Sequence, residues 1–220
     1  MRGFSLVEMM VVLTIIVLVT TVAVMGQTTF NRSLILTDTA YTIAFSLREA
    51  QTLGLSSRVA GTSVYNAGYG IRFSTQTPHA YVLFADTSPA EPGNTQSGYC
   101  PGHTEPVTSP DSHPGDCIYD QSVAAELVRT YTLNRGYRIY QFCGREWGGN
   151  DELCSGEDFE TMHISFMRPS TDTVIFGRTT GGAQLLRLTD ATIYLQSPDA
   201  VTERCITISK VGQIGVDECP

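Results

Sequence analysis

The sequence predicts an α+β protein in which one long N-terminal helix packs on an antiparallel β-sheet head. An almost wholly apolar segment, residues 4–26, indicates the first half of the helix. Residues 27–57 repeat apolar side chains at three- and four-residue spacing, which predicts an amphipathic second half. Residues 58–220 contain short β-rich runs separated by turn residues, which is typical of antiparallel strands. A helix followed by a series of strands indicates the α+β class.

The apolar first half is long enough to cross a membrane. No charged residue occurs from residue 9 to residue 31, and a membrane-spanning helix needs roughly 20 apolar residues. The single acid near its start, Glu8, is unusual because a carboxylate in lipid is costly and commonly has a functional partner. A cleaved secretory signal peptide would place Glu8 inside its apolar region. A plain membrane anchor would account for the length but not for this acid.

The amphipathic second half carries one apolar stripe that we expect to face a core. The stripe consists of Leu36, Ala40, Ile43, Ala44, Leu47, Ala50 and Gln51, with Gly54 extending it. The opposite face carries Asp38, Thr42, Arg48 and Glu49. A continuous helix from residue 4 to residue 55 would be roughly 78 Å long at about 1.5 Å per residue. One half would be apolar on all sides, and the other half would dock on the head.

The first residues of the chain, after Met1, also form a specific motif, RGFSLVEMMVVLTIIV. This motif resembles the leader of type IV pilins and type II secretion pseudopilins, in which a short basic leader ends in a glycine. The resemblance implies that residues 1–3 form the leader, that a prepilin peptidase and methyltransferase cuts after Gly3, and that Phe4 becomes the N-methylated first residue. It also implies a pilin-like fold, with Glu8 at the fifth position of the processed chain.

The resemblance implies that the fifth-position acid meets the N-terminal amine of a neighbouring subunit, which here would be that of Phe4. Electrostatics favours this ion pair, because opposite charges attract strongly in a low-dielectric setting. An unpaired charge in the same setting costs free energy. The resemblance thus implies that an inner-membrane assembly platform joins the chain to identical or related subunits in a pilus or pseudopilus. The chain would be a single-pass protein of the cytoplasmic membrane first, and part of a cell-surface or periplasmic filament afterwards.

The strand pattern of the head begins after residue 60. We expect strands at 62–66, 69–74, 79–85, 127–133, 137–142, 161–167, 173–178, 191–196, 205–209 and 213–216. The segments LREAQTLGLSS, ISFMRPS and CITISKVGQIGV are similar to pieces of the GspH/FimT type of minor pilin. This second resemblance favours a minor subunit. It leaves open a tip pilin that binds DNA or a surface ligand, and a type II secretion pseudopilin.

The six cysteines lie far from the apolar N-terminus, between residues 100 and 219, in the part of the chain that is richest in glycine and proline. An even number in this setting indicates disulfides and an oxidising compartment. Cys205 and Cys219 are symmetric about Gly212, so a three-residue loop at 211–213 would place them opposite each other in a hairpin. Proximity in the sequence favours two further pairs, although six cysteines allow many other pairings: Cys143–Cys154 and Cys100–Cys117.

A long segment, residues 86–122, is rich in proline, glycine, serine, threonine and aspartate, and we expect it to be a loop. It contains Cys100-x-x-His103 and His113-x-x-x-Cys117, a spacing that can hold Zn²⁺ in a tetrahedral site. A disulfide between the two cysteines is the favoured alternative in an exported protein, because zinc binding requires both thiolates in reduced form.

Acidic residues at the ends of this loop are candidates for a different metal. Asp86 and Asp120 abut predicted strands, and carboxylate oxygens suit Ca²⁺. Some pilins and pseudopilins hold Ca²⁺ in a comparable loop, so the resemblance adds to this hypothesis. A solvated acidic loop without metal is the favoured alternative. We expect no other cofactor.

The segment RTYTLNRGYRIY, residues 129–140, interleaves Arg129, Arg135 and Arg138 with tyrosines. Interleaved arginine and aromatic residues can grip single-stranded nucleic acid. A hairpin with one solvent-exposed face explains the same alternation and is favoured, and a formal charge of −8 is unfavourable for a DNA-binding protein. The sequence contains no phosphate-binding loop, HExxH motif or nucleophile elbow, so we do not expect an enzyme.

Overall fold

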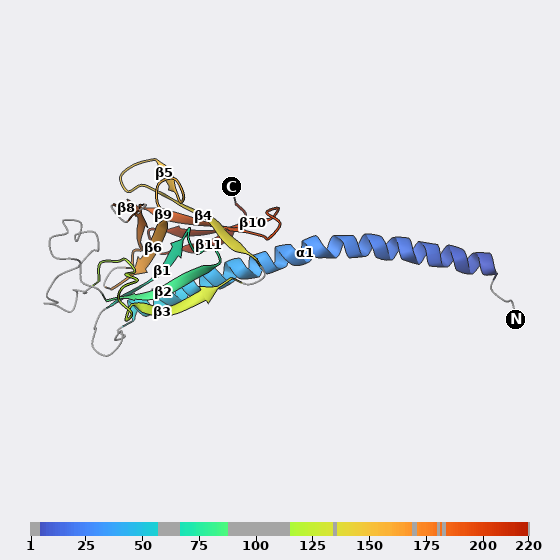
Figure 1. Ribbon diagram of the computed structural model, residues 1–220, viewed down its shortest axis with the longest axis horizontal. Coiled ribbons are helices and arrows are strands. Elements are labelled where there is room, and N and C mark those ends of the chain that lie inside the picture. The colour runs from blue at the N-terminus through green and yellow to red at the C-terminus, as the bar shows by residue number, and fades with distance from the viewer. Residues whose placement is uncertain are drawn as a thin grey trace.

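A single helix, α1 (Leu6–Leu55), extends over 50 residues and accounts for both predicted halves. The computed structural model describes residues 5–56, 67–87, 115–133, 136–168, 171–179, 181 and 184–219, and for residues 25–30 it describes the backbone alone. The first half of α1 projects away from the head, whereas the second half lies along it (Figure 1). The long helix therefore has one half that the head covers and one half that it leaves uncovered.

The described residues of the head form two antiparallel sheets. Their strands are β1 (Gly68–Ser74), β2 (Ala80–Asp86), β3 (Leu127–Thr132), β4 (Arg138–Arg145), β5 (Glu152–Cys154), β6 (Thr161–Phe166), β7 (Val174–Arg178), β8 (Leu185–Leu188), β9 (Asp190–Gln196), β10 (Glu203–Ser209) and β11 (Ile214–Asp217). The first sheet has the order β3-β2-β1-β6-β7-β8, and the second has the order β11-β10-β9-β4-β5. This arrangement confirms the predicted α+β, pilin-like fold with a long helix on an antiparallel β head.

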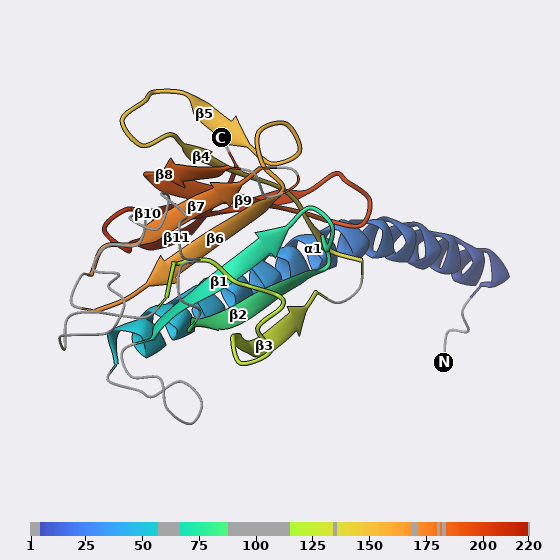
Figure 2. The ribbon, with the colours of Figure 1, turned by 60° about the vertical axis from the view of Figure 1, so that its left-hand side comes forward.

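The predicted apolar stripe of α1 is buried against both sheets. Leu36, Ala40, Ile43, Leu47 and Ala50 have no exposed surface, and they share one hydrophobic core with residues of β1, β2, β4, β6, β9 and β10. Helix α1 contacts β1 and β6 of the first sheet and β9, β10 and β11 of the second, and Figure 2 shows it running along β1 and β2. Each buried leucine or isoleucine contributes about 1.5–3 kcal/mol, so this stripe anchors the helix on the head.

Gly54 lets the last turn of α1 approach the first sheet closely. A Cβ atom at this position would clash with the carbonyl oxygen of Phe166, at the end of β6, and would lie 2.7 Å from its carbonyl carbon. Nearby in the core, the Ser46 Oγ and Tyr81 hydroxyl groups are hydrogen-bonded at 2.9 Å, so both polar groups are satisfied. Backbone proximity at Gly54 and apolar packing along the stripe together determine how the helix sits.

The terminal hairpin of β10 and β11 has a different register from the predicted one. Cys205 faces Asp217 and not Cys219, because the loop is centred on Val211 and not on Gly212. Gly212 occupies the last loop position with a φ of 79°, a left-handed conformation that favours glycine. Cys219 lies just beyond the end of β11 and is still disulfide-bonded to Cys205, with the two Cα atoms 5.0 Å apart. The predicted pair is present, although the predicted register was wrong.

The segments 127–133 and 137–142 do not form the predicted hairpin with each other. Strand β3 pairs with β2 at the edge of the first sheet, whereas β4 pairs with β9 and β5 in the second. The physical reason is packing, because β4 buries Ile139 and Phe142 in the core while most side chains of β3 are exposed. Strands β5 and β8 were not predicted. The strand predicted at 62–66 lies outside the described residues.

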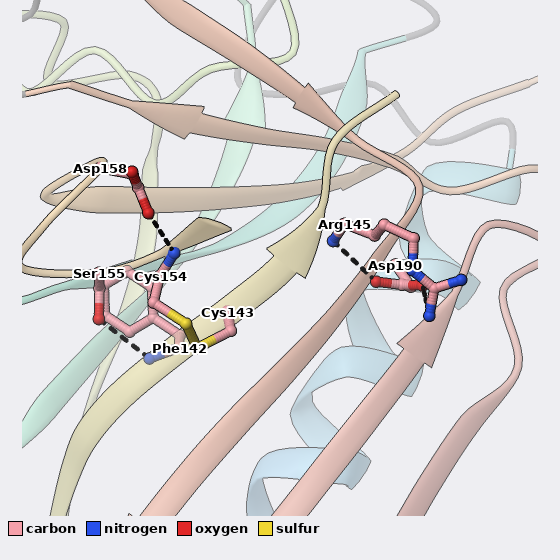
Figure 3. The surroundings of a disulfide bond; sticks show 7 residues. All are labelled: Phe142, Cys143, Arg145, Cys154, Ser155, Asp158 and Asp190. Carbon is pink, nitrogen blue, oxygen red and sulfur yellow. Dashed lines mark hydrogen bonds and ion pairs between the residues drawn. A yellow bond between two sulfur atoms is a disulfide. The ribbon is translucent and has the colours of Figure 1, made fainter. Parts of the chain in front are cut away.

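The predicted disulfide between Cys143 and Cys154 joins β4 to the short strand β5. The two cysteines face each other directly across the strands, with their Cα atoms 4.1 Å apart. Figure 3 shows two hydrogen bonds beside it: the Cys154 N–H donates to Asp158 Oδ2 at 2.7 Å, and the Phe142 N–H donates to Ser155 Oγ at 3.0 Å. The covalent bond and these hydrogen bonds hold β5 at the edge of the second sheet.

Replacing Cys143 and Cys154 together by alanine is expected to lower the free energy of unfolding by about 2–4 kcal/mol, because the bond restricts the unfolded chain. Strand β5 should also lose protection from amide hydrogen exchange more than β9 does. Denaturant unfolding and hydrogen exchange of the full chain in detergent measure both effects. The Cys205→Ala/Cys219→Ala variant is the matched control and should expose β11 instead. Wild-type stability and wild-type exchange at β5 would contradict the prediction.

Candidate functional site

The first half of α1 presents an apolar surface on all sides. The segment Leu6–Val24, 19 residues with a mean hydropathy of 2.6, is long and apolar enough to cross a membrane. Every side chain in this segment is exposed; Leu6, for example, is 77% exposed and Val22 73%. An apolar surface of this size marks an interaction with lipid or with other apolar protein surfaces.

The threonines of this half satisfy their hydroxyl groups within the helix. Thr14, Thr20 and Thr21 each donate a hydrogen bond of 2.8 Å to the carbonyl oxygen four residues earlier. No hydroxyl proton of these side chains therefore needs a partner in an apolar environment. Glu8 is then the one ionisable side chain between Leu6 and Val24.

Glu8 lies in the first turn of α1, where a negative charge interacts favourably with the helix dipole. Its side chain is exposed, and it forms no ion pair with any residue that the structure describes. The two predicted processing residues, Gly3 and Phe4, lie outside the described residues. The carboxylate of Glu8 is therefore open to a cationic partner that approaches the start of the helix.

The second half of α1 carries an additional, exposed apolar stripe opposite the face that docks on the head. Leu34, Tyr41 and Phe45 are 53, 50 and 64% exposed. Spacings of seven and four residues place them on one side of the helix, together with the exposed Asp38 and Arg48. The sequence prediction treated this side as polar, although the regular spacing of the three large side chains was a signal for a second apolar stripe.

The match to known families falls on the start of this helix. Residues 1–24 match the family model described as the prokaryotic N-terminal methylation motif. The chain carries a type IV pilin or pseudopilin signal. No curated protein and no solved structure matches the chain. The signal indicates a structural subunit that is processed by a prepilin peptidase and anchored in a membrane before assembly. The GspH/FimT type of head stays a prediction.

The candidate Ca²⁺ ligands lie where β2 meets the segment before β3. Asp86 is fully buried, and its carboxylate accepts the N–H groups of Asp116 at 3.0 Å and Cys117 at 2.7 Å. Burial, followed by the charge of Asp116, raises the pKa of Asp86 well above its usual value. Asp120 is exposed, and its N–H donates to the buried Glu126 at 2.6 Å.

Through these hydrogen bonds, Asp86 and Glu126 hold the segment before β3 against β2. The sequence prediction missed Glu126, because no local pattern distinguishes a buried acid that binds backbone N–H groups from a solvated one. Among the described residues, no group of three histidine, cysteine or acidic side chains is arranged to hold a metal ion. Ca²⁺ binding at Asp86 and Asp120 stays a prediction.

Cys117, one of the candidate Zn²⁺ ligands, is disulfide-bonded and fully buried. It has a left-handed φ of 69°, and its carbonyl oxygen accepts a hydrogen bond from Ser165 Oγ at 2.9 Å. A disulfide-bonded sulfur is not a thiolate, so the zinc hypothesis is wrong for this cysteine. The other members of the proposed zinc spacing, one of which is the predicted disulfide partner, lie outside the described residues: Cys100, His103 and His113.

The two described arginines of the predicted nucleic-acid site lie on different sheets. Arg129 is on β3, with its Nη1 atom 3.8 Å from Glu49 Oε1 of α1. Arg138 is on β4, and its Nε and Nη2 atoms donate to Gln196 Oε1 at 3.1 and 2.6 Å. Arg135 lies outside the described residues. Both described guanidinium groups thus contact side chains of neighbouring elements, α1 and β9, and nucleic-acid binding stays a prediction.

His163, which the sequence prediction treated as an ordinary strand residue, is a buried part of the outer face of the first sheet. The Tyr119 N–H donates to its Nδ1 atom at 3.0 Å, so this nitrogen carries no proton. The proton of the neutral ring is therefore on Nε2, which lies 3.1 Å from Thr161 Oγ1. Burial, followed by the charges of Arg72 and Arg178, lowers the pKa of His163 well below its usual value.

The free energy of unfolding of the head is expected to fall on acidification because of His163. The unfolded chain takes up a proton near the ordinary histidine pKa of 6.5, whereas the buried ring stays neutral to lower pH. Below that pH the unfolded state binds more protons, so stability decreases by up to about 1.4 kcal/mol per pH unit until the folded pKa is reached.

The His163→Gln variant separates this effect from every other titration in the chain. Glutamine keeps a donor and an acceptor but does not titrate, so the variant should lose the part of the slope that His163 causes. Denaturant unfolding between about pH 7 and pH 5 measures the slope in both proteins. Equal slopes in the wild type and the variant would show that His163 does not control acid stability.

Proposed function

We propose that the chain is a type IV pilin-like structural subunit that is cleaved after Gly3, N-methylated at Phe4 and assembled through α1 into a pilus or pseudopilus filament. The proposal rests on one observation, the two-part helix. Its first half is apolar and exposed on all sides, and its second half is anchored in the head by a buried stripe. A single element can therefore serve as a membrane anchor before assembly and as part of a filament core afterwards.

The exposed apolar surface of α1 must be shielded from water both before assembly and in the filament. Before assembly, lipid covers Leu6–Val24 and the head remains in water. In a filament, the first halves of neighbouring copies cover one another. A second apolar surface lies further along α1, on the part that bears the head. It is the exposed stripe of Leu34, Tyr41 and Phe45. Packing between neighbouring subunits can therefore extend along the second half of the helix.

Processing creates the partner that Glu8 lacks within its own helix. Cleavage after Gly3 gives Phe4 a free amine, which is positively charged and keeps its charge when it is methylated. Neighbouring helices can be shifted along their axes so that this amine no longer meets the Glu8 carboxylate of a neighbour. Two charges are then unpaired among apolar helices, at a cost of several kcal/mol per ion. The pair therefore selects one axial register between subunits.

The cellular partners follow from this sequence of events. A prepilin peptidase and methyltransferase processes the chain in the cytoplasmic membrane, and an inner-membrane assembly platform adds it to identical or related subunits. The filament then lies in the periplasm or on the cell surface. Disulfides in the head, Cys143–Cys154 and Cys205–Cys219, are compatible with an oxidising compartment on that side of the membrane.

Mass spectrometry of sheared filaments tests the proposal directly. We expect a peptide that begins with N-methylated Phe4 in the filament fraction, and no peptide that contains Met1. The membrane fraction of cells without the prepilin peptidase is the control, and it should contain the unprocessed chain. Absence of the chain from filaments, or filaments that contain an unprocessed N-terminus, would overturn the proposed function.

A further inference from the structure

A polar cavity lies on the outer face of the first sheet, away from the helix. Its volume is about 320 Å³, and Arg72, Thr161, His163 and Arg178 are among the residues that line it. Arg72 faces His163 across β1 and β6, and Arg178 faces Thr161 across β7 and β6. Because side chains alternate between the two faces of a strand, this register places all four on the same face of the sheet.

No described carboxylate lies within ion-pair distance of either arginine of the cavity, although Asp120 and Glu160 line the same cavity. Among the described residues, Arg72 and Arg178 form no ion pair, and Arg72 instead lies over the Tyr119 ring at 5.7 Å from its centroid. Burial lowers the pKa of Arg72; Tyr119 opposes this shift, and the charge of Arg178 adds to it. A partly buried guanidinium close to a second one is electrostatically unfavourable, and a bound anion would relieve this repulsion.

Hydrogen bonds orient a third donor toward the same cavity. Since His163 Nδ1 accepts the Tyr119 N–H, the His163 Nε2–H donates to Thr161 Oγ1. The Thr161 oxygen thus acts as an acceptor, and its own hydroxyl proton is left for an acceptor in the cavity. The site combines two guanidinium groups with one hydroxyl proton, and these groups can all donate to one anion.

We propose that this cavity binds a sugar phosphate or a sugar acid, whose anionic group is held by Arg72, Arg178 and Thr161. Planar guanidinium groups match phosphate and carboxylate oxygens with paired hydrogen bonds. The carboxylates of Asp120 and Glu160 also line the cavity, and they can accept hydrogen bonds from sugar hydroxyl groups. These carboxylates and the overall charge of −8 disfavour an extended polyanion such as DNA. The proposal concerns the head alone and does not depend on filament assembly.

Titration calorimetry of the full chain in detergent micelles, with four probes, tests the proposal. The probes are glucose 6-phosphate, glucuronate, inorganic phosphate and glucose. We expect at least one anionic sugar to bind and glucose not to bind. Arg72→Gln and Arg178→Gln should each weaken binding by about tenfold or more, because each removes charge-assisted hydrogen bonds. Arg145→Gln removes the same charge from an exposed arginine of β4 outside the cavity and should leave the affinity unchanged.

The pattern across probes also identifies the anionic group. Competition of inorganic phosphate with glucose 6-phosphate assigns a phosphate, whereas binding of glucuronate alone assigns a carboxylate. The proposal would be overturned if glucose bound as tightly as the anionic sugars. It would also be overturned if none of the sugars bound. An equal loss of affinity in Arg145→Gln and Arg72→Gln, which indicates non-specific charge attraction, would overturn it as well. Thermal unfolding checks the fold of each variant, and the exposed Arg178 gives a decisive variant if Arg72→Gln fails to fold.

Discussion

Glu8→Ala is expected to abolish filament assembly while leaving cleavage after Gly3 intact. Without Glu8, the amine of Phe4 would enter a bundle of apolar helices as an unpaired charge. Breaking a buried ion pair in this way costs about 3–5 kcal/mol, which weakens each subunit contact by roughly two to four orders of magnitude. Membrane insertion depends on the apolar surface, which the substitution preserves, so the processed chain should accumulate in the membrane.

The assay compares the amounts of subunit in sheared filaments and in membranes, and it determines the N-terminus in both fractions. Glu8→Gln preserves the size of the side chain but not its charge, and it should fail to assemble as well. Glu157→Gln changes an exposed acid in a turn of the head and serves as the matched control. Normal filaments from Glu8→Ala would show that this charge pair does not select the register between subunits.

Gly54→Ala is expected to lower the free energy of unfolding by about 3 kcal/mol, at the upper end of the usual cost of overpacking. In an unconstrained helix the same substitution would be stabilising by about 1 kcal/mol, because alanine favours the helix. Here the new methyl group meets the backbone of Phe166, and a backbone carbonyl cannot rotate away as a side chain can. Helix α1 would have to move away from β6, which would loosen the packing of the buried stripe.

Thr52→Ala is the matched control for this prediction, because residue 52 lies two positions away on the exposed side of the same helix. It also raises helix propensity, but it adds no group to the interface, so stability should be unchanged or slightly increased. Denaturant unfolding of the full chain in detergent compares the two variants. A Gly54→Ala variant as stable as the wild type would mean that α1 and β6 are not in close contact in solution.

The helix could be predicted well because its determinants are local. The length of the apolar run and the position of Glu8 can be read directly from the sequence, and the buried stripe followed from its three- and four-residue spacing. Even so, the sequence prediction missed the exposed stripe of Leu34, Tyr41 and Phe45. This side of the helix mixes large apolar residues with Asp38 and Arg48. From the sequence, it is not evident which of these residues the head covers and which stay exposed.

The strands were less predictable than the helix. Most strand segments followed from their alternation, but β3 and β4 belong to different sheets, and their proximity in sequence suggested a hairpin. Pairing is decided by which side chains the core accepts, and Ile139 and Phe142 brought β4 into the second sheet. In the last hairpin, the need for a positive φ at Gly212 set the loop and shifted the register.

The sequence by itself determined the two-part helix and the processing signal, and it favoured the cysteine pairs Cys143–Cys154 and Cys205–Cys219, which the structure contains. These features depend on composition, spacing and short separations along the chain. The tertiary structure alone decided that the buried acids Asp86 and Glu126 bind backbone N–H groups, and that Arg72 and Arg178 share a cavity. Asp86 and Cys117 are 31 residues apart, and Arg72 and Arg178 lie on β1 and β7. Their proximity depends on sheet order and on burial, which no local pattern encodes.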